Sequence, residues 1–156
     1  MPVVSVTRLR VRSWRYLLPF VFFALRSSRQ AKVAEGNLHV ALLRDAKSTF
    51  WTRTVWTTDA AMKAFMLSGP HRQVMPRLLD WCDEAAVVHW VQDTDQRPDW
   101  HEAHDRLQQE GRAPRYVTPH QRTRDLIYPD PSYAAKNAQT ACWECNRDDV
   151  TSTTCR

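Results

Sequence analysis

Hydrophobic and polar positions at the start of the chain follow two different periods. Val3–Val11 alternates, with β-branched residues throughout, which predicts a strand. Ser13 is a suitable N-cap, and from Trp14 to Ala34 the apolar residues recur at steps of three and four, which predicts a helix. Pro19 falls inside this helix, where we expect a bend, and Gly36 is a natural stop.

Two further alternating segments follow, over 37–43 and 49–57, and the short polar connector between them predicts a hairpin. In register, one face would carry Leu38, Val40, Leu42, Phe50, Thr52 and Thr54. The other would carry His39, Ala41, Trp51, Arg53 and Val55. Neither face is purely polar, so we expect both to be covered.

The segment 58–91 adds helix, helix and strand. Thr58 or Asp59 caps a helix that ends at Ser68-Gly69-Pro70, His71–Asp83 reads as a second helical piece, and Ala85–Val91 alternates again. The order β-α-β-β-α-β is that of a ferredoxin-like α+β fold. Such a sheet has helices on one face only, so its apolar second face predicts a homodimer of sheets.

The pattern changes after residue 92. Asp99–Glu110 predicts a helix, 114–130 reads as an extended arm rich in Arg and Pro, and 131–156 has little apolar content. We therefore divide the chain into a ferredoxin-like domain over 1–92, a C-terminal helix and arm over 93–130, and a disordered tail over 131–156.

Composition and charge narrow the function classes. The chain has 156 residues but only 3 Gly, widely spaced, so it offers neither a phosphate-binding P-loop nor a dinucleotide-binding loop. The net charge of +5 is concentrated in residues 1–35. The apolar run Tyr16–Leu25 is too short to span a bilayer, and Arg26 follows it where a secretion signal would have small residues. We expect a cytoplasmic protein with no membrane or nucleic-acid partner.

Three motifs resemble the antibiotic biosynthesis monooxygenase-like superfamily: Phe50-Trp51-Thr52-Arg53-Thr54-Val55-Trp56, then Asp59-Ala60-Ala61-Met62-Lys63-Ala64-Phe65, then Ser68-Gly69-Pro70-His71. The resemblance covers about residues 3–92 and agrees with the independently predicted element order. It implies a dimeric α+β barrel. Trp81-Cys82-Asp83-Glu84 is similar, more loosely, to spheroidene monooxygenase-like proteins.

Members of this superfamily include cofactor-free quinone-forming monooxygenases, haem-degrading enzymes, other haem-dependent enzymes and proteins without known activity, and fold alone does not choose among them. The haem-degrading branch carries Asn on the first strand and Trp and His on the second helix. Here Thr7, Phe65 and Met75 stand at those positions, with His71 one turn earlier. This departure argues against haem degradation of that type, although His71 remains a candidate haem ligand.

His71 is the leading candidate for chemistry. At the start of a helix bordering the space between sheet and helices, it could serve as general base, axial ligand or hydrogen-bond donor, or simply cap the helix. The tryptophans of the domain could wall an apolar pocket for a flat phenolic substrate, or only fill the core and a dimer interface. The candidate substrate-binding residues are Thr7, Trp51, Arg53, Trp56, Phe65 and His89.

Other polar clusters are weaker candidates. Arg53 beside His39 could bind an anion or lie at a rim. His101 and His104 share a helical face but lack a third metal ligand, so we expect a solvated helix and no metal site. Cys142 and Cys145 form a CxxC pair with Cys155 beyond, without a fourth zinc ligand in the tail. An unstructured pair and a redox or metal role both remain open.

The sequence thus predicts a monooxygenase-like oxidoreductase acting on a small aromatic or polyene substrate, without a flavin or nicotinamide site. The cofactor is none or haem. The alternatives are a haem-binding enzyme of the same fold with His71 as ligand, and a non-catalytic ligand-binding or dimerisation module in which the tryptophans only pack.

Overall fold

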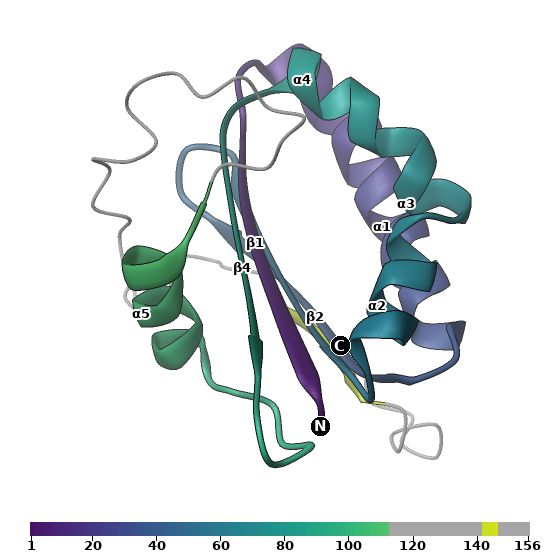
Figure 1. Cartoon of the computed structure of the whole chain (residues 1–156). Helices are drawn as coiled ribbons and strands as arrows, with labels where there is room; N and C mark the ends of the chain where they lie inside the picture. The colour runs from purple at the N-terminus through teal and green to yellow at the C-terminus, as the bar shows by residue number, and fades with distance from the viewer. Residues whose placement is uncertain (113–141, 147–156) are drawn as a thin grey trace.

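The computed structural model describes residues 1–112, and the backbone of residues 142–146. Its centre is one antiparallel sheet, seen edge-on in Figure 1. The strands lie in the order β4 (Cys82–Val91), β1 (Val3–Val11), β3 (Thr49–Trp56), β2 (Asn37–Asp45) and β5 (Cys142–Asn146). The first four strands, with their helices, form the predicted ferredoxin-like α+β arrangement.

Helices cover one face of the sheet (Figure 1). These are α1 (Leu17–Val33), α2 (Asp59–Met66), α3 (Gly69–Val74) and α4 (Leu78–Trp81), with 3-10 turns η1 (Trp14–Tyr16) before α1 and η2 (Met75–Arg77) between α3 and α4. The predicted β-α-β-β-α-β order is confirmed. The segment predicted as a single helix over His71–Asp83 is instead broken at Pro76, which lacks the N–H that a continuous helix needs.

The helix predicted over Trp14–Ala34 also differs at its start. Residues 14–16 form the tighter 3-10 turn, and the α-helix begins at Leu17. Pro19 therefore falls in the first α-helical turn, where a backbone N–H has no partner within the helix. The mid-helix bend that we expected at Pro19 is replaced by this change of helix type.

The hairpin of β2 and β3 has the predicted alternation except at one end. Leu42 pairs with Thr52 and Val40 with Thr54, but the register shifts between Asn37 and His39. This irregularity sends Leu38 to the opposite face from Val40, against the prediction, and Leu38 packs with the core that contains Trp51.

The second face of the sheet is covered by α5 (Trp100–Glu110) of the same chain (Figure 1). Ala103 and Leu107 of α5 are fully buried against Val4, Val6 and Trp51. The sequence analysis expected this face to be uncovered within one chain and available to a second copy. That premise was wrong, because α5 of the same chain covers the face. The narrow apolar stripe of α5 is enough to cover this face, because the small Ala103 side chain lets the helix approach the sheet closely.

The prediction of a disordered tail over 131–156 is wrong for five residues. Cys142–Asn146, inside the segment expected to be disordered, forms β5 and pairs antiparallel with β2 over residues 39–43. An edge strand has unpaired backbone donors and acceptors, which an added strand satisfies. The arm over 114–130 and the rest of 131–156 lie outside the described residues.

Candidate functional site

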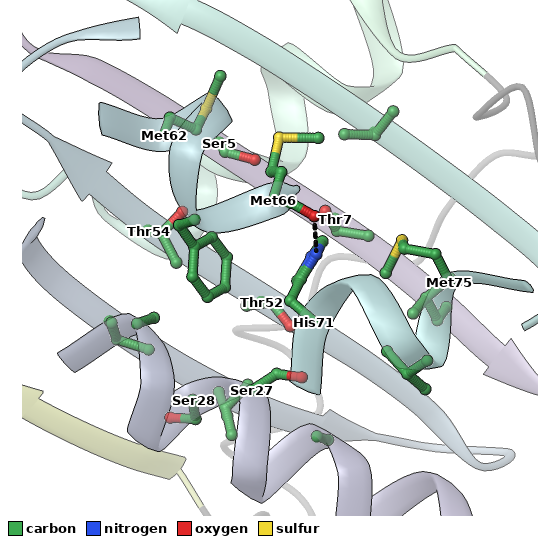
Figure 2. A pocket seen from close by; sticks show the side chains of 18 of the residues that line it. Ser5, Thr7, Ser27, Ser28, Thr52, Thr54, Met62, Met66, His71 and Met75 are labelled. Carbon is green, nitrogen blue, oxygen red and sulfur yellow. Dashed lines mark hydrogen bonds between the residues drawn. The ribbon is translucent and has the colours of Figure 1, made fainter. Parts of the chain in front are cut away.

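A cavity of about 120 Å³ lies between the sheet and its helix layer. Figure 2 shows the side chains that point into it from β1, β3, α1, α2 and α3. The size is close to that of engineered apolar cavities that bind a benzene ring. Its lining is largely apolar, with a few hydroxyl and imidazole groups, which is the usual composition of a small-molecule site.

The floor of the cavity consists of two rows of residues across the sheet. Ser5 pairs with Thr54 on one side and His89 on the other, and Thr7 pairs with Thr52 and Val87. Serine and threonine are small for the centre of a sheet that faces helices. The helix layer therefore does not fill the space above them, and the cavity follows from these residue choices.

Aromatic rings form one wall. Trp56, at the end of β3, stacks on Phe65 of α2 with ring centroids 5.0 Å apart, and Phe65 in turn contacts the His71 ring at 4.6 Å. The indole N–H of Trp56 donates to the Thr54 hydroxyl at 2.9 Å. This bond fixes both a wall and a floor residue.

His71 is held in a defined orientation. Its Nδ1 lies 3.1 Å from the Met66 carbonyl oxygen, which can only accept, so Nδ1 carries the proton in the neutral ring. Figure 2 shows this bond at the edge of the cavity. Nε2 is then the basic nitrogen. Burial lowers the pKa of His71, partly offset by the Met66 carbonyl, so the ring is neutral near pH 7.

One amide side chain ties together the elements that carry this histidine. Gln30 of α1 accepts from the His71 backbone N–H at 2.9 Å and donates to the Ser68 carbonyl at 3.0 Å and the Phe65 carbonyl at 3.3 Å. Gly69 lies against this amide with a positive φ of 52°, and a Cβ there would come within 3.0 Å of it. Glycine is therefore required where the chain enters α3.

Ser27 adds a polar group on the wall opposite the sheet. Its hydroxyl oxygen is buried and has no hydrogen-bond partner among the described residues, and the side chain lines the cavity. A buried hydroxyl without a partner is costly, and a bound ligand with a polar atom would satisfy it.

Of the predicted site residues, the fold brings five together. Thr7, Trp56, Phe65, His71 and His89 all line the cavity. Burial lowers the pKa of His89, and the nearby Arg112 charge lowers it further, so His89 is a second neutral imidazole on the floor.

Trp51 and Arg53 lie elsewhere. Alternation along β3 turns both toward α5, away from the cavity. The Arg53 guanidinium stacks over the Trp100 ring at 4.3 Å, and His39 contacts Arg97 at 3.3 Å. The expected anion site between Arg53 and His39 is instead a buried contact region beneath the segment that leads into α5.

Sequence reasoning missed several lining residues. Ser5, Ser27, Thr52 and Thr54 supply hydroxyls, and Met62, Met66 and Met75 supply flexible apolar surface. A signal for Ser27 was present, because Phe20, Ala24, Ser27 and Ala31 follow helical spacing and so share one face of α1.

The described part of the chain contains neither a metal-binding cluster nor a membrane-spanning helix. It contains no cluster of three or more His, Cys, Asp or Glu side chains suited to a metal ion. Cys82 is a free, buried thiol whose pKa burial raises to about 12, so it is no nucleophile at neutral pH. In residues 1–112 and 142–146, no helix combines the length and apolar character needed to cross a membrane.

Comparison with known families assigns the chain. The profile of a family described as a domain of unknown function, DUF3291, matches residues 23–124. The chain belongs to the DUF3291 family. This match begins inside α1 and covers the hairpin, the cavity helices, β4 and α5. A search of curated proteins found no match to this DUF3291 chain.

Solved structures show the fold that this DUF3291 chain shares. An antibiotic biosynthesis monooxygenase aligns with a TM-score of 0.53 at 12% identity, over 59% of this chain and 99% of its own. A candidate antibiotic biosynthesis monooxygenase from Nitrosomonas europaea aligns with a TM-score of 0.53 at 16% identity, over 59% and 90%. Rv0793 from Mycobacterium tuberculosis aligns with a TM-score of 0.55 at 11% identity, over 60% and 97%.

These structures confirm the predicted resemblance to the antibiotic biosynthesis monooxygenase-like superfamily at the level of the fold. The looser similarity to spheroidene monooxygenase-like proteins stays a prediction.

Proposed function

We propose that this DUF3291 protein is a cofactor-independent monooxygenase for a small aromatic substrate with an ionisable hydroxyl. The observation that carries the proposal is His71, whose Nδ1–H is committed to the Met66 carbonyl beside a mostly apolar cavity. Nε2 can therefore accept a proton from a bound phenol. The fold shared with antibiotic biosynthesis monooxygenases supports this reading.

The proposed reaction needs only substrate and dioxygen. His71 takes the phenolic proton, and the resulting anion is electron-rich enough to reduce O₂ directly. At an activated ring methylene, CH₂ is oxidised to C=O by four electrons. One oxygen atom of O₂ enters the carbonyl and the other leaves as water with the two methylene protons. The floor hydroxyls of Thr7 and Thr52 would hold the substrate oxygen by hydrogen bonds.

The cavity size favours an aromatic ring over the predicted polyene. At about 120 Å³ it suits a small ring system, whereas drug-sized sites begin near 300 Å³. The predicted homodimer and cytoplasmic location stay predictions.

Haem, the cofactor of the alternative reading, does not fit this site. The carbonyl-bound Nδ1 of His71 is the arrangement typical of a metal-ligating histidine. However, a porphyrin is far larger than the cavity, which Phe65 and Trp56 close on one side. No step through haem is proposed.

Oxygen uptake tests the proposal. The purified protein is supplied with small phenols that carry an activated ring methylene, with hydroquinones that lack it and with a carotenoid, without added cofactor, while an electrode follows O₂ and mass spectrometry follows products. We expect turnover of a phenol. His71→Gln should lower kcat by ~10²–10⁴-fold, the usual contribution of a general base, with little change in KM.

His101→Gln is the matched control, because His101 is exposed on α5, away from the cavity. Equal turnover in the His71→Gln and His101→Gln variants contradicts the base assignment. If phenols quench tryptophan fluorescence in the wild type but not in Trp56→Phe, and no O₂ is consumed, the cavity belongs to a non-catalytic binding module.

A further inference from the structure

The outward face of α1 and the turn before it form an exposed apolar stripe. Trp14 is 80% exposed, Leu18 82%, Phe22 56% and Leu25 41%. Their spacing of four, four and three residues aligns them along one side of the helix, opposite the side that lines the cavity. Scattered exposed apolar residues are ordinary, but a continuous aromatic and aliphatic stripe marks an interaction surface.

Positive charge surrounds this stripe. Arg15, Arg26 and Arg29 are exposed around it, and the Arg26 guanidinium lies 5.5 Å from the centre of the Phe22 ring. Residues 1–34 contain no Asp or Glu at all. A partner must therefore offer both an apolar phase and negative charge.

Two protein occupants fit this requirement poorly. A second copy docking through the same face would bring the same arginines together and repel. The segment 113–141 of this chain contains more Arg and Lys than Asp and Glu, so it lacks the complementary charge. A convex helix face also provides no groove for a peptide.

We propose that α1 docks on an anionic lipid surface, lying flat with Trp14, Leu18 and Phe22 at the level of the headgroups and upper acyl chains. Amphipathic helices with Trp, Leu and Phe on one side and Arg beside them bind membranes in this way. The arginines would contact lipid phosphates. The sequence analysis expected no membrane partner because the apolar run is too short to span, and this peripheral mode needs no spanning helix.

Vesicle co-sedimentation of the full chain tests the proposal. The vesicles contain either phosphatidylcholine alone or phosphatidylcholine mixed with phosphatidylglycerol. We expect binding to the anionic vesicles that weakens with salt. The double variant Leu18→Gln/Phe22→Gln should bind at least about tenfold more weakly, because two large side chains no longer enter the lipid. Arg26→Gln/Arg29→Gln should lose the preference for anionic vesicles.

Leu67→Gln is the matched control, since Leu67 is 69% exposed but lies after α2, away from the stripe. All substituted side chains are exposed, so the variants should fold, which circular dichroism checks. Brominated lipids provide a second readout. They should quench tryptophan fluorescence in the wild type, and Trp14→Phe should remove most of that quenching.

Several outcomes overturn the proposal. One is that neither vesicle is bound. Another is that the stripe variant binds like Leu67→Gln. A third is that ultracentrifugation shows a dimer that Leu18→Gln/Phe22→Gln dissolves, which would make a second copy the occupant. A fourth is that RNA binds the stripe more tightly than the anionic vesicles do. None of these bears on phenol oxidation, which is measured separately without lipid.

Discussion

The two faces of the sheet, built from alternate residues of the same strands, differ in how tightly they are packed. Toward α1–α4, the central rows are Ser5, Thr7, Thr52 and Thr54, and a cavity remains above them. Toward α5, the corresponding residues are larger, and the space is filled. The core there contains Val4, Val6, Trp51, Val55 and Leu107, all nearly inaccessible to solvent.

Charged groups differ between the faces as well. On the α5 side, Arg8 is buried and donates to Glu84 at 2.8 Å, and its guanidinium lies 5.8 Å from the Trp51 ring centre. On the cavity side, the titratable groups are the two histidines with lowered pKa values. The comparison indicates that the tightly packed core lies mainly on the α5 face, whereas the chemistry proposed above would take place on the other face.

The largest expected effect is on the filled face. Trp51→Ala should lower the free energy of unfolding by about 4 kcal/mol, because it removes a fully buried indole and leaves a cavity beside Val55. Trp14→Ala, at an 80% exposed position, is the control and should change the stability by less than about 0.5 kcal/mol. Urea unfolding measures both. Similar losses in the two variants would contradict the assignment of the main core to this face.

The next effect concerns the buried ion pair. Glu84→Gln removes the carboxylate that accepts from the buried Arg8 guanidinium and also contacts Arg10, and we expect a loss of about 3 kcal/mol. Asp59→Asn, which breaks the exposed pair of Asp59 with Lys63, should cost under about 1 kcal/mol. Raising the salt concentration should reduce the stability difference from the wild type for Asp59→Asn but much less for Glu84→Gln. An equal reduction would mean that solvent screens the Arg8–Glu84 pair as it screens an exposed pair.

A reciprocal pair of substitutions sharpens the comparison. Val88→Thr places a hydroxyl in the filled face and should cost about 2 kcal/mol. Thr52→Val removes a hydroxyl from the cavity floor and should change stability by less than about 0.5 kcal/mol while weakening phenol binding. Thermal unfolding and ligand titration provide the two readouts. Equal stability losses would mean that the faces are packed alike.

The smallest expected effect is on the pH dependence of the free energy of unfolding. The contribution of the two cavity histidines and that of the Arg10–Asp83 pair should be lost in different pH ranges. Burial lowers the pKa values of His71 and His89, so their contribution to stability is complete above about pH 6.5 and decreases as the pH falls below it. The hydrogen bonds from Arg10 lower the pKa of Asp83, so its contribution persists above pH 3.8 and is lost only at more acidic pH. Urea unfolding of His71→Gln/His89→Gln against pH should show only the acidic transition. An unchanged profile would refute the histidine assignment.

The sequence predicted most of the fold because alternation and helical spacing are strong in residues 3–91. It could not predict the docking of α5, since an eleven-residue helix with a narrow stripe does not reveal which surface it covers. The site was predicted in part. Trp56 and Phe65 were named as candidate substrate-binding residues and do line the cavity, but Trp51 was grouped with them although alternation already turned it to the opposite face. Helical spacing already placed Ser27 on the cavity-facing side of α1, but only the structure shows that its buried hydroxyl has no partner among the described residues.

Gln30 gives α1 a mechanical role. Its side-chain amide binds the carbonyls of Phe65 and Ser68 and the backbone N–H of His71, at the junction of α2 and α3. A shift or tilt of α1 would therefore displace the His71 ring as well. If the outward side of α1 binds a lipid surface, the Gln30 side chain would transmit a displacement of the helix to His71. The position of Nε2, which is proposed to accept the substrate proton, would then change as well.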